Sequence, residues 1–232
     1  MCSSDQKGAA AARTMEDDCA VIVFVKEPKP GFCKTRLIPA VGAEQAARIS
    51  RQMTEHCMRR LDQCHPNVAI FVEYASVQEE ENFFESWLRP FLSGQRRVHF
   101  GSQVESKDLG ERMQRSFEKV FDTSNCGQVV IVGTDAPDIH ASLIEQALLS
   151  LRLGKADVVL GPAMDGGYYL LGLRSVHPSL FTGILWSTDS VLQCTLERAS
   201  KLQLHVLQLE TLADVDTEED LHVWHRVQDS QI

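Results

Sequence analysis

A basic segment carries the residue types that bind phosphate. The sequence KEPKPGFCKTRL, residues 26–37, places Lys34 and Arg36 after Gly31, with Lys26 at its start. Arginine offers a bidentate fork to phosphate oxygens, whereas lysine offers a compact point charge. Gly31 lets backbone N–H groups approach a ligand closely. The segment therefore predicts a site for a di- or triphosphate group, with a solvated basic loop as the alternative. It is not a P-loop, because the chain has no GxxxxGK[ST] motif.

Aspartates in two later segments are candidates for binding a divalent cation. Asp135 lies in GTDAPD, directly after an apolar run, and Asp216 lies in the acidic segment DVDTEEDL. Mg²⁺ prefers a few carboxylates together with substrate phosphates, so Asp135 and Asp216 are predicted to hold Mg²⁺, or Mn²⁺, beside bound phosphates. The alternatives are a turn aspartate at Asp135 and an ordinary helix start at Asp216. We expect Asp138 to cap the helix that begins near His140.

A third candidate segment, GPAMDGGYYLLGL, contains an aspartate before paired glycines. Asp165 precedes Gly166 and Gly167, and Tyr168 follows them. Adjacent glycines allow a backbone to approach a ligand closely, but Asp-Gly is also a strong signal for a hairpin turn. From the residues alone, both interpretations stay open.

Apolar runs of strand length alternate with amphipathic patterns along the chain. Strands are predicted at 19–26, 68–74, 96–100, 128–135, 156–162, 167–173 and 204–209. Helices are predicted at 43–64, after Pro137, around Phe83 and Trp87, and at Thr217, where Asp220 completes a capping-box spacing. Such alternation predicts an α/β fold with a mostly parallel sheet, and ligands bind at the carboxyl ends of its strands. The candidate segments all follow or precede predicted strands.

Composition limits the kinds of partner and compartment. A net charge of -9 over 232 residues disfavours nucleic-acid and anionic-membrane binding, and no apolar run approaches the length of a membrane span. The seven cysteines are scattered without a CxxC pair, which favours a reducing, cytoplasmic location. Cys57 and Cys64 lie two helical turns apart and cannot converge on one zinc ion, so His56, Cys57, Cys64 and His65 are interpreted as core and surface residues. Residues 1–18 are small and polar, so we predict a disordered leader followed by one domain over residues 19–228.

Six segments in order resemble a known family. They are VKEPKPGFCKTRL, DLGERM, VGTDAPD, GPAMDGGYYLLGL, LFTGILWST and DVDTEEDL, spread between Cys19 and Arg226. Together they resemble the DUF2064 family of GT-A-type glycosyltransferases in the nucleotide-diphospho-sugar transferase superfamily. The chain is also similar to molybdenum cofactor guanylyltransferase and to 2-phospholactate guanylyltransferase. The resemblance implies a single-domain GT-A fold, a Rossmann-like three-layer sandwich with a mostly parallel central sheet.

The resemblance also implies roles for individual residues. The nucleotide would contact Lys26, Lys34, Arg36, Leu109, Gly110 and Glu111. The acceptor side of the site would include Gly166, Gly167, Tyr168 and Trp186. The metal would be held by Asp135 and Asp216, and the catalytic residues would be Asp135 and Asp165.

The activity expected from these features is a Mg²⁺-dependent transfer of a sugar from a nucleotide sugar to a small-molecule acceptor. The first alternative is a nucleotidyltransferase, guanylyltransferase-like, that moves a nucleoside monophosphate from a triphosphate to a small phosphorylated acceptor. The second is a non-catalytic nucleotide-binding regulatory module.

Two departures from characterised relatives bear on the choice between these activities. The glycine-rich LAAGxGxRM loop is replaced by the basic loop, and the middle strand exit has one carboxylate, Asp135, in place of a D-x-D. A D-x-D does occur at Asp214 to Asp216.

Overall fold

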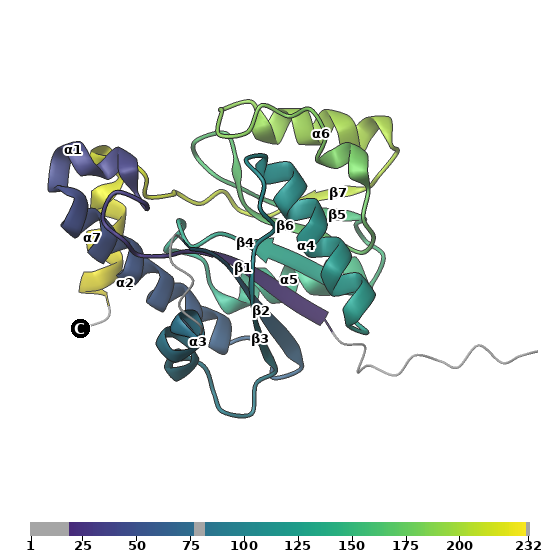
Figure 1. Cartoon of the computed structure of the whole chain (residues 1–232). Helices are drawn as coiled ribbons and strands as arrows, with labels where there is room; N and C mark the ends of the chain where they lie inside the picture. Colours follow the sequence, from purple (N-terminus) through teal and green to yellow (C-terminus); the bar gives the residue numbers. More distant parts are fainter. Residues whose placement is uncertain (1–18, 77–81, 231–232) are drawn as a thin grey trace, which may run out of the picture.

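The central sheet has seven strands and a mostly parallel arrangement. The structure is a computed structural model that describes residues 19–76 and 82–230, so the predicted leader lies outside the described residues (Figure 1). The strands are β1 Cys19–Lys26, β2 Val68–Ala75, β3 Val98–Ser102, β4 Gln128–Val132, β5 Val158–Pro162, β6 Tyr168–Leu173 and β7 Val206–Gln208. Their order is β3-β2-β1-β4-β6-β5-β7, and β6 alone runs antiparallel to both of its neighbours. The loops that leave β1, β3, β4, β5 and β7 therefore emerge at one edge of the sheet.

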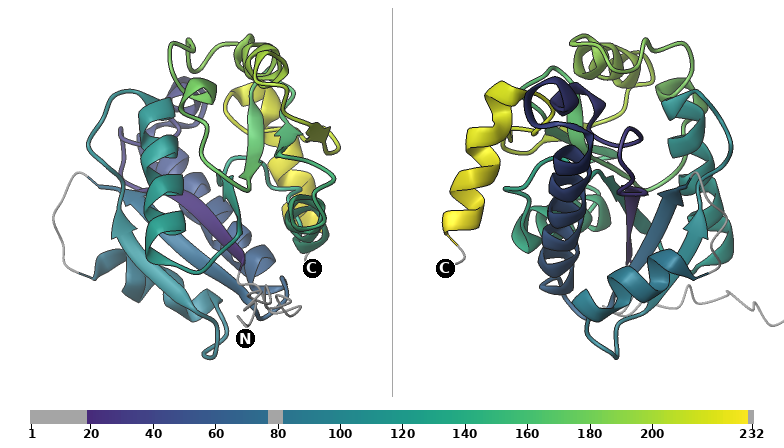
Figure 2. Two further views of the ribbon diagram at one scale, coloured as in Figure 1. Left: turned by 90° about the vertical axis from the view of Figure 1, so that its right-hand side faces the viewer. Right: turned by 60° about the vertical axis from the view of Figure 1, so that its left-hand side comes forward.

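Helices cover both faces of this sheet (Figure 2). The longer ones are α2 Ala43–Asp62, α4 Leu109–Thr123, α5 Ala141–Arg152, α6 Val191–Lys201 and α7 Leu221–Asp229, and the shorter ones are α1 Ile38–Val41 and α3 Phe83–Leu88. The helices α2, α3 and α5 contribute to the apolar cluster on one face, and α4 and α6 to the cluster on the other. The result is the three-layer α/β/α sandwich that the sequence predicts.

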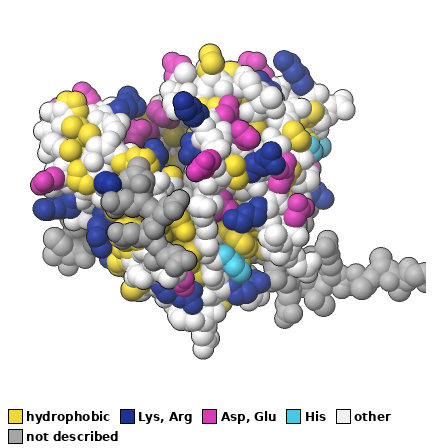
Figure 3. All heavy atoms as spheres, viewed as in Figure 1, with side chains coloured by type: hydrophobic (Ala, Val, Ile, Leu, Met, Phe, Trp, Pro, Cys, Tyr) yellow, Lys and Arg dark blue, Asp and Glu magenta, His cyan; other side chains and the backbone are white. Residues whose placement is uncertain are grey.

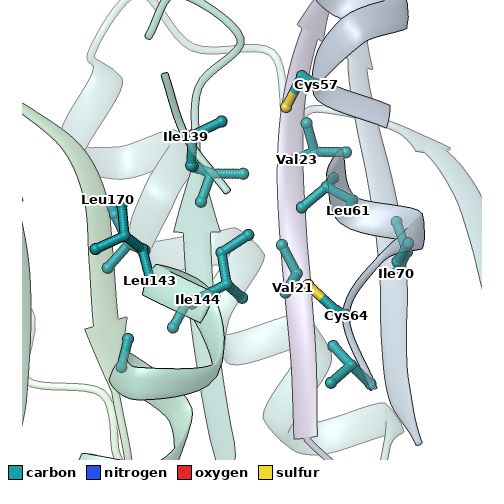
Figure 4. Close-up of a cluster of buried hydrophobic side chains, with 14 of the residues drawn as sticks. Val21, Val23, Cys57, Leu61, Cys64, Ile70, Ile139, Leu143, Ile144 and Leu170 are labelled. Atoms are coloured by element: carbon teal, nitrogen blue, oxygen red, sulfur yellow. The ribbon is translucent and has the colours of Figure 1, made fainter. Parts of the chain in front are cut away.

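The central strand β1 is buried on both faces, which explains its unbroken apolar sequence. Side chains alternate along a strand, so Val21 and Val23 face one cluster while Ala20 and Ile22 face the other. Figure 4 shows Val21 and Val23 packed toward Leu61 of α2. A site at the carboxyl end of β1 thus rests on a well-packed core.

A third, smaller apolar cluster lies beside the sheet and joins segments far apart in the sequence. Leu37 follows the basic loop, Val215 precedes Asp216, and Trp224 belongs to α7, and all three are buried in this cluster against α2. The Val215 N–H also donates a hydrogen bond of 2.9 Å to the backbone oxygen of Asp135. This cluster therefore fixes the basic loop and both candidate metal ligands relative to one another.

Most predicted elements are confirmed, with ends that differ by a few residues. All seven strands form, although β4 ends at Val132 and leaves residues 133–135 in a loop. The capping box of Thr217 and Asp220 is present at the start of the short helix before α7. The expected cap at Asp138 is wrong: α5 begins at Ala141, and Asp138 accepts an ion-paired hydrogen bond from Arg226 of α7 instead.

Candidate functional site

A crevice of about 770 Å³ opens over the carboxyl ends of β1 and β4. The space-filling view (Figure 3) shows a hollow in the surface between the region of α1, at the upper left, and the region of α6, at the upper right. Charged side chains lie at its edge. One set of lining residues is apolar and forms a floor: Phe24, Leu109, Met113, Ile131 and Leu171. A second set is cationic: Lys26, Lys34, Arg36, Lys107 and Arg112. A crevice of this size, with an apolar floor and convergent charges, suits a nucleotide.

Lys34 lies at the centre of the polar part of the crevice. Its ammonium nitrogen forms an ion pair with the carboxylate of Asp135, lies 3.1 Å from Asp216 Oδ1, and donates to the Val215 carbonyl at 2.6 Å. An ammonium has three N–H donors, so these three oxygens use all of them. The Lys34 side chain is only 5% exposed, and its backbone is left-handed, with φ 47°. The lysine is therefore an internal cation that joins two aspartates from distant loops.

Mutual attraction keeps this ion pair charged. Burial by itself would lower the pKa of Lys34, but the negative charges of Asp135 and Asp216 outweigh it and the pKa is raised. Burial would likewise raise the pKa of Asp135, yet the Lys34 ammonium outweighs it and this pKa is lowered. The Asp135 side chain is nevertheless 54% exposed toward the crevice, so its carboxylate is accessible to a ligand.

The remaining predicted cations stand at the edge of the crevice. Lys26 is the exposed last residue of β1, and the Arg36 guanidinium lies 3.7 Å from Asp216 Oδ2 with its side chain 66% exposed. Lys107, which was not singled out in the sequence, is also exposed and lines the crevice. These side chains can reach phosphate oxygens without breaking a buried contact.

Arg112 is a further crevice residue that the sequence pattern did not reveal. Its Nη1 donates to Gln103 Oε1 at 2.8 Å, and Gln103 Nε2 donates to the backbone oxygen of Glu73 at 3.0 Å. The Arg112 Nε is buried and has no hydrogen-bond partner among the described residues, and burial lowers the pKa of this side chain. Arg112 lies one helical turn after Leu109, so the helical period of α4 is the signal that could have identified it.

A second, smaller pocket of about 210 Å³ shares part of this lining and is strongly acidic. Asp135 and Asp216 border both pockets, while Asp165 and Asp214 line the small one alone. Aromatic residues complete it: Tyr168, Tyr169 and Trp186. Burial, and then the charge of Asp165, raise the pKa of Asp214 to about 6. Within the described part of the chain, no lysine or arginine lines this pocket.

The Asp165-Gly166-Gly167 segment is both a hairpin connection and part of the small pocket. It joins the antiparallel strands β5 and β6, and Asp165 Oδ1 accepts a hydrogen bond from the Gly167 N–H at 2.8 Å. Gly166 has φ 87°, and a Cβ there would lie 2.2 Å from the Asp189 backbone oxygen. Asp165 and Gly167 line the pocket, whereas Gly166 is required for close packing. The two interpretations of this motif are therefore compatible.

Gly110 and Glu111, which were expected near the nucleotide, do not line the crevice. Instead, both residues help to hold α4 in place. A Cβ on Gly110 would lie 2.4 Å from the Phe181 backbone oxygen and 2.6 Å from a Trp186 ring carbon, so this glycine admits the Trp186 ring. The Glu111 N–H donates to the capping carboxylate of Asp108 at 3.0 Å, and its own carboxylate accepts from the Ser106 hydroxyl. Leu109, the third residue of this group, does line both pockets.

The three-layer sandwich with its mostly parallel seven-stranded sheet has the nucleotide-diphospho-sugar transferase fold. A family model described as "Uncharacterized protein conserved in bacteria (DUF2064)" matches residues 58–188, and the chain belongs to this family. It is 37% identical to a protein from Desulfovibrio desulfuricans G20 described as a candidate nucleotide-diphospho-sugar transferase. That match covers 90% of this chain and 86% of the other, with a TM-score of 0.77. A comparison with curated proteins found no match.

Two solved structures of lower identity share the fold alone. One is CMP:2-keto-3-deoxy-manno-octonic acid synthetase complexed with CTP, at 11% identity and a TM-score of 0.57, covering 93% of this chain and 100% of the other. The second is the inositol-1-phosphate CTP transferase from T. maritima, at 11% identity and a TM-score of 0.53, covering 91% of this chain and 96% of the other.

None of the helices in the described residues combines the length and the apolar character that a membrane span requires.

Proposed function

We propose that this protein is a glycosyltransferase that transfers a sugar from a nucleotide sugar to an uncharged hydroxyl acceptor, with Mg²⁺ or Mn²⁺ as cofactor. The observation that carries the proposal is the division of charge between the two pockets. The large crevice is lined by five cations and suits a nucleoside diphosphate. The small pocket has no lysine or arginine in its described lining, and it adds Asp165 and Asp214 to the two aspartates that it shares with the crevice. The similarity to the Desulfovibrio protein supports the same class of donor.

The acidic pocket argues against a phosphorylated acceptor. A nucleotidyltransferase of the kind expected as the alternative would have to seat an acceptor phosphate next to the reacting phosphate. Asp165 and Asp214 would repel such an anion, and like charges placed at close range in a partly buried site are costly. A sugar hydroxyl carries no charge, and the sugar ring can pack on Tyr168 or Trp186. The charge pattern therefore favours glycosyl over nucleotidyl transfer.

The residues of the crevice fit a divalent cation. The carboxylates of Asp135 and Asp216 and the carbonyl of Val215 all converge on one cation, the Lys34 ammonium. Oxygen ligands of this kind suit Mg²⁺ and Mn²⁺, with phosphate oxygens of the nucleotide completing the set. A bound ion would stabilise the negative charge that develops on the departing diphosphate. Lys26, Arg36 and Lys107 would neutralise the same group from the edge of the crevice.

We infer that Asp165 is the residue that acts on the acceptor. Its Oδ1 is held by the Gly167 N–H, which fixes the carboxylate at the small pocket. From there it can orient the attacking hydroxyl and accept its proton as the bond to the sugar forms. Asp214, in the same pocket, can accept a hydrogen bond from a second hydroxyl of the acceptor. Trp186 and Tyr168 exclude water from one side.

The test compares donors and acceptors in matched pairs. UDP-glucose, GDP-mannose and ADP-glucose are each incubated with the protein, Mg²⁺ and either a neutral sugar or its phosphate ester, and the products are identified by mass spectrometry. We expect release of a nucleoside diphosphate with a neutral acceptor. Asp165→Asn should lower turnover about 10²- to 10⁴-fold while donor affinity is kept, whereas Asp122→Asn, on the exposed side of α4, should leave both unchanged.

Two other results would contradict the proposal. Release of pyrophosphate from a nucleoside triphosphate, with a phosphorylated acceptor, would identify a nucleotidyltransferase. Tight nucleotide binding without any turnover would identify a regulatory nucleotide-binding module.

A further inference from the structure

The Lys34 ammonium occupies the place where the metal would bind. Its three partners are the carboxylates of Asp135 and Asp216 and the carbonyl of Val215. These are the oxygens that the proposed function assigns to the divalent cation, and the side chain is almost fully buried among them. We refer to these three oxygen-bearing groups as the oxygen cage. A cation is therefore already present in the cage when no ligand is bound.

We propose that Lys34 and the divalent cation compete for the oxygen cage, so that metal enters only together with a nucleotide whose phosphates take over the ammonium. This inference rests on the proposed function and adds an order of binding to it. The cage cannot serve both cations at once, because two positive charges a few ångströms apart repel each other strongly in a partly buried site.

Metal alone gives the displaced ammonium no replacement for its partners. Lys34 would lose three hydrogen-bonded oxygens and would carry a buried, unpaired charge, which is strongly unfavourable. A diphosphate in the crevice changes this balance, because its oxygens can accept the three N–H groups. Lysine has a long, flexible stem, so the ammonium can move toward the crevice while the backbone stays in place.

The backbone around Lys34 supports a movement of the side chain alone. The left-handed conformation at Lys34 precedes a short helix over Thr35–Leu37, and Leu37 is fully buried in the third apolar cluster. The Lys34 carbonyl also accepts a hydrogen bond from the Leu37 N–H at 3.0 Å. The loop is thus anchored directly after Lys34, and the ammonium is the part that can move.

The experiment measures Mn²⁺ binding by electron paramagnetic resonance, with Mn²⁺ as the probe and no need for turnover. Wild-type protein should bind Mn²⁺ weakly when the ion is added alone, and at least tenfold more tightly after GDP or UDP is added. Lys34→Met should bind Mn²⁺ alone at least tenfold more tightly than wild type. Lys201→Met is the matched control, because it removes an exposed lysine at the end of α6 that lines neither pocket, and it should behave as wild type.

A second substitution locates the ion in the cage. Adding Asp216→Asn to Lys34→Met should abolish the gained Mn²⁺ affinity. Circular dichroism shows whether each variant is folded, and Lys34→Gln replaces Lys34→Met if the latter is not. Mn²⁺ binding to wild type alone that equals binding with nucleotide would overturn the proposal. Folded Lys34 variants that gain no Mn²⁺ affinity would also overturn it.

Failure of this inference and failure of the proposed function give different results. The comparison of wild type with Lys34→Met uses no nucleotide, so it reports on the cage alone. A gain of Mn²⁺ affinity in Lys34→Met without binding of any nucleotide would keep the competition between the two cations and reject the nucleotide-dependent order and the proposed transferase. Nucleotide binding and turnover without a gain of Mn²⁺ affinity in Lys34→Met would reject the competition between the two cations and keep the proposed transferase.

Discussion

At the scale of single residues, the cations of the crevice differ in how well their hydrogen-bonding groups are satisfied. All three donors of Lys34 are used within the protein, whereas the Arg112 guanidinium has a buried Nε without a partner among the described residues. Buried polar groups are normally paired, and an exception in a crevice points to a ligand. We therefore infer different tasks for the two cations: Lys34 organises the aspartates, and Arg112 is available to bind the proposed nucleotide.

This difference predicts the effect of replacing Arg112. Arg112→Met should weaken binding of the nucleoside diphosphate roughly 10- to 100-fold, since a hydrogen bond to a charged group contributes about 1.5–3 kcal/mol. Arg115→Met, an exposed position on the same helix, should bind as wild type does. Titration calorimetry gives both affinities, and equal affinities for the two variants would show that Arg112 does not contact the ligand.

The residues of the site were predictable only in part. Asp135 stands out because it directly follows an apolar run, where α/β folds place their sites. Lys34 stands out because it lies in the basic segment, and Asp216 because it lies in an acidic octapeptide. The sequence does not say that Lys34 pairs with Asp216 across 182 positions, because that contact depends on how the third apolar cluster packs. The motif that contains Leu109 to Glu111 does not identify Arg112, because only one face of the helix meets the crevice and that face includes Leu109 and Arg112 but not Gly110 or Glu111.

At the scale of elements, the start of α4 is fitted against the segment that carries Trp186. Gly110 has no room for a side chain there, since the Phe181 backbone and the Trp186 ring fill the space. Trp186 in turn borders both pockets. One close helix contact therefore sets the position of an aromatic ring that lines both pockets.

Enlarging this contact should disturb fold and site together. Gly110→Ala is expected to destabilise the protein by about 1–3 kcal/mol, because an extra methyl group in a filled space forces its neighbours to shift. Gly127→Ala, where a Cβ meets nothing within 4 Å, should have a much smaller effect. Urea unfolding measures both variants, and comparable losses would mean that the Trp186 contact is not critical.

Strands were easier to predict than helices for a physical reason. A strand buried on both faces, such as β1 or β4, is an unbroken apolar run and hence obvious in the sequence. The helix α6 carries a weak buried stripe of Val191, Thr195 and Ala199, and its period was not recognised. The reversed direction of β6 follows only from the hairpin interpretation of Asp165-Gly166, which the sequence left open, because side-chain alternation is the same for either strand direction.

At the scale of the whole molecule, His56 connects three separate segments beneath the site. It lies on α2, its Nε2–H donates to the Pro137 carbonyl at 2.9 Å, and its ring meets Trp224 of α7 edge-on. Burial lowers the pKa of His56; Arg60 and Arg59 lower it further, whereas the hydrogen bond to Pro137 and the charge of Asp138 oppose them. The neutral ring is thus part of the packing between α2, α7 and the Asp135 loop.

A lowered pKa sets the direction of the pH dependence. The contribution of neutral His56 to stability is present above its unfolded pKa of 6.5 and is lost as the pH falls through the lower folded value. Wild type should therefore lose more stability than His56→Gln between pH 7 and pH 5. Chemical denaturation at several pH values provides the comparison.

The quantity to compare is the difference in unfolding free energy between wild type and His56→Gln, because contributions common to both proteins cancel. Asp214, with a pKa raised to about 6, acts in the opposite direction and favours the fold as the pH falls, but it does so equally in both proteins. Parallel stability curves for wild type and His56→Gln would show that His56 does not titrate in this range.

The wide separation of the site's parts along the chain also has a kinetic consequence. Lys34 contacts Val215 and Asp216, which lie 181 and 182 positions further along the chain. A backbone hydrogen bond also joins Asp135 to Val215. Contacts that close such long loops form late, because the entropy of loop closure must be overcome before the contact can contribute. A refolding chain should therefore complete its sheet well before it can hold a cation between the two aspartates. Recovery of Mn²⁺–nucleotide binding would then lag behind recovery of secondary structure.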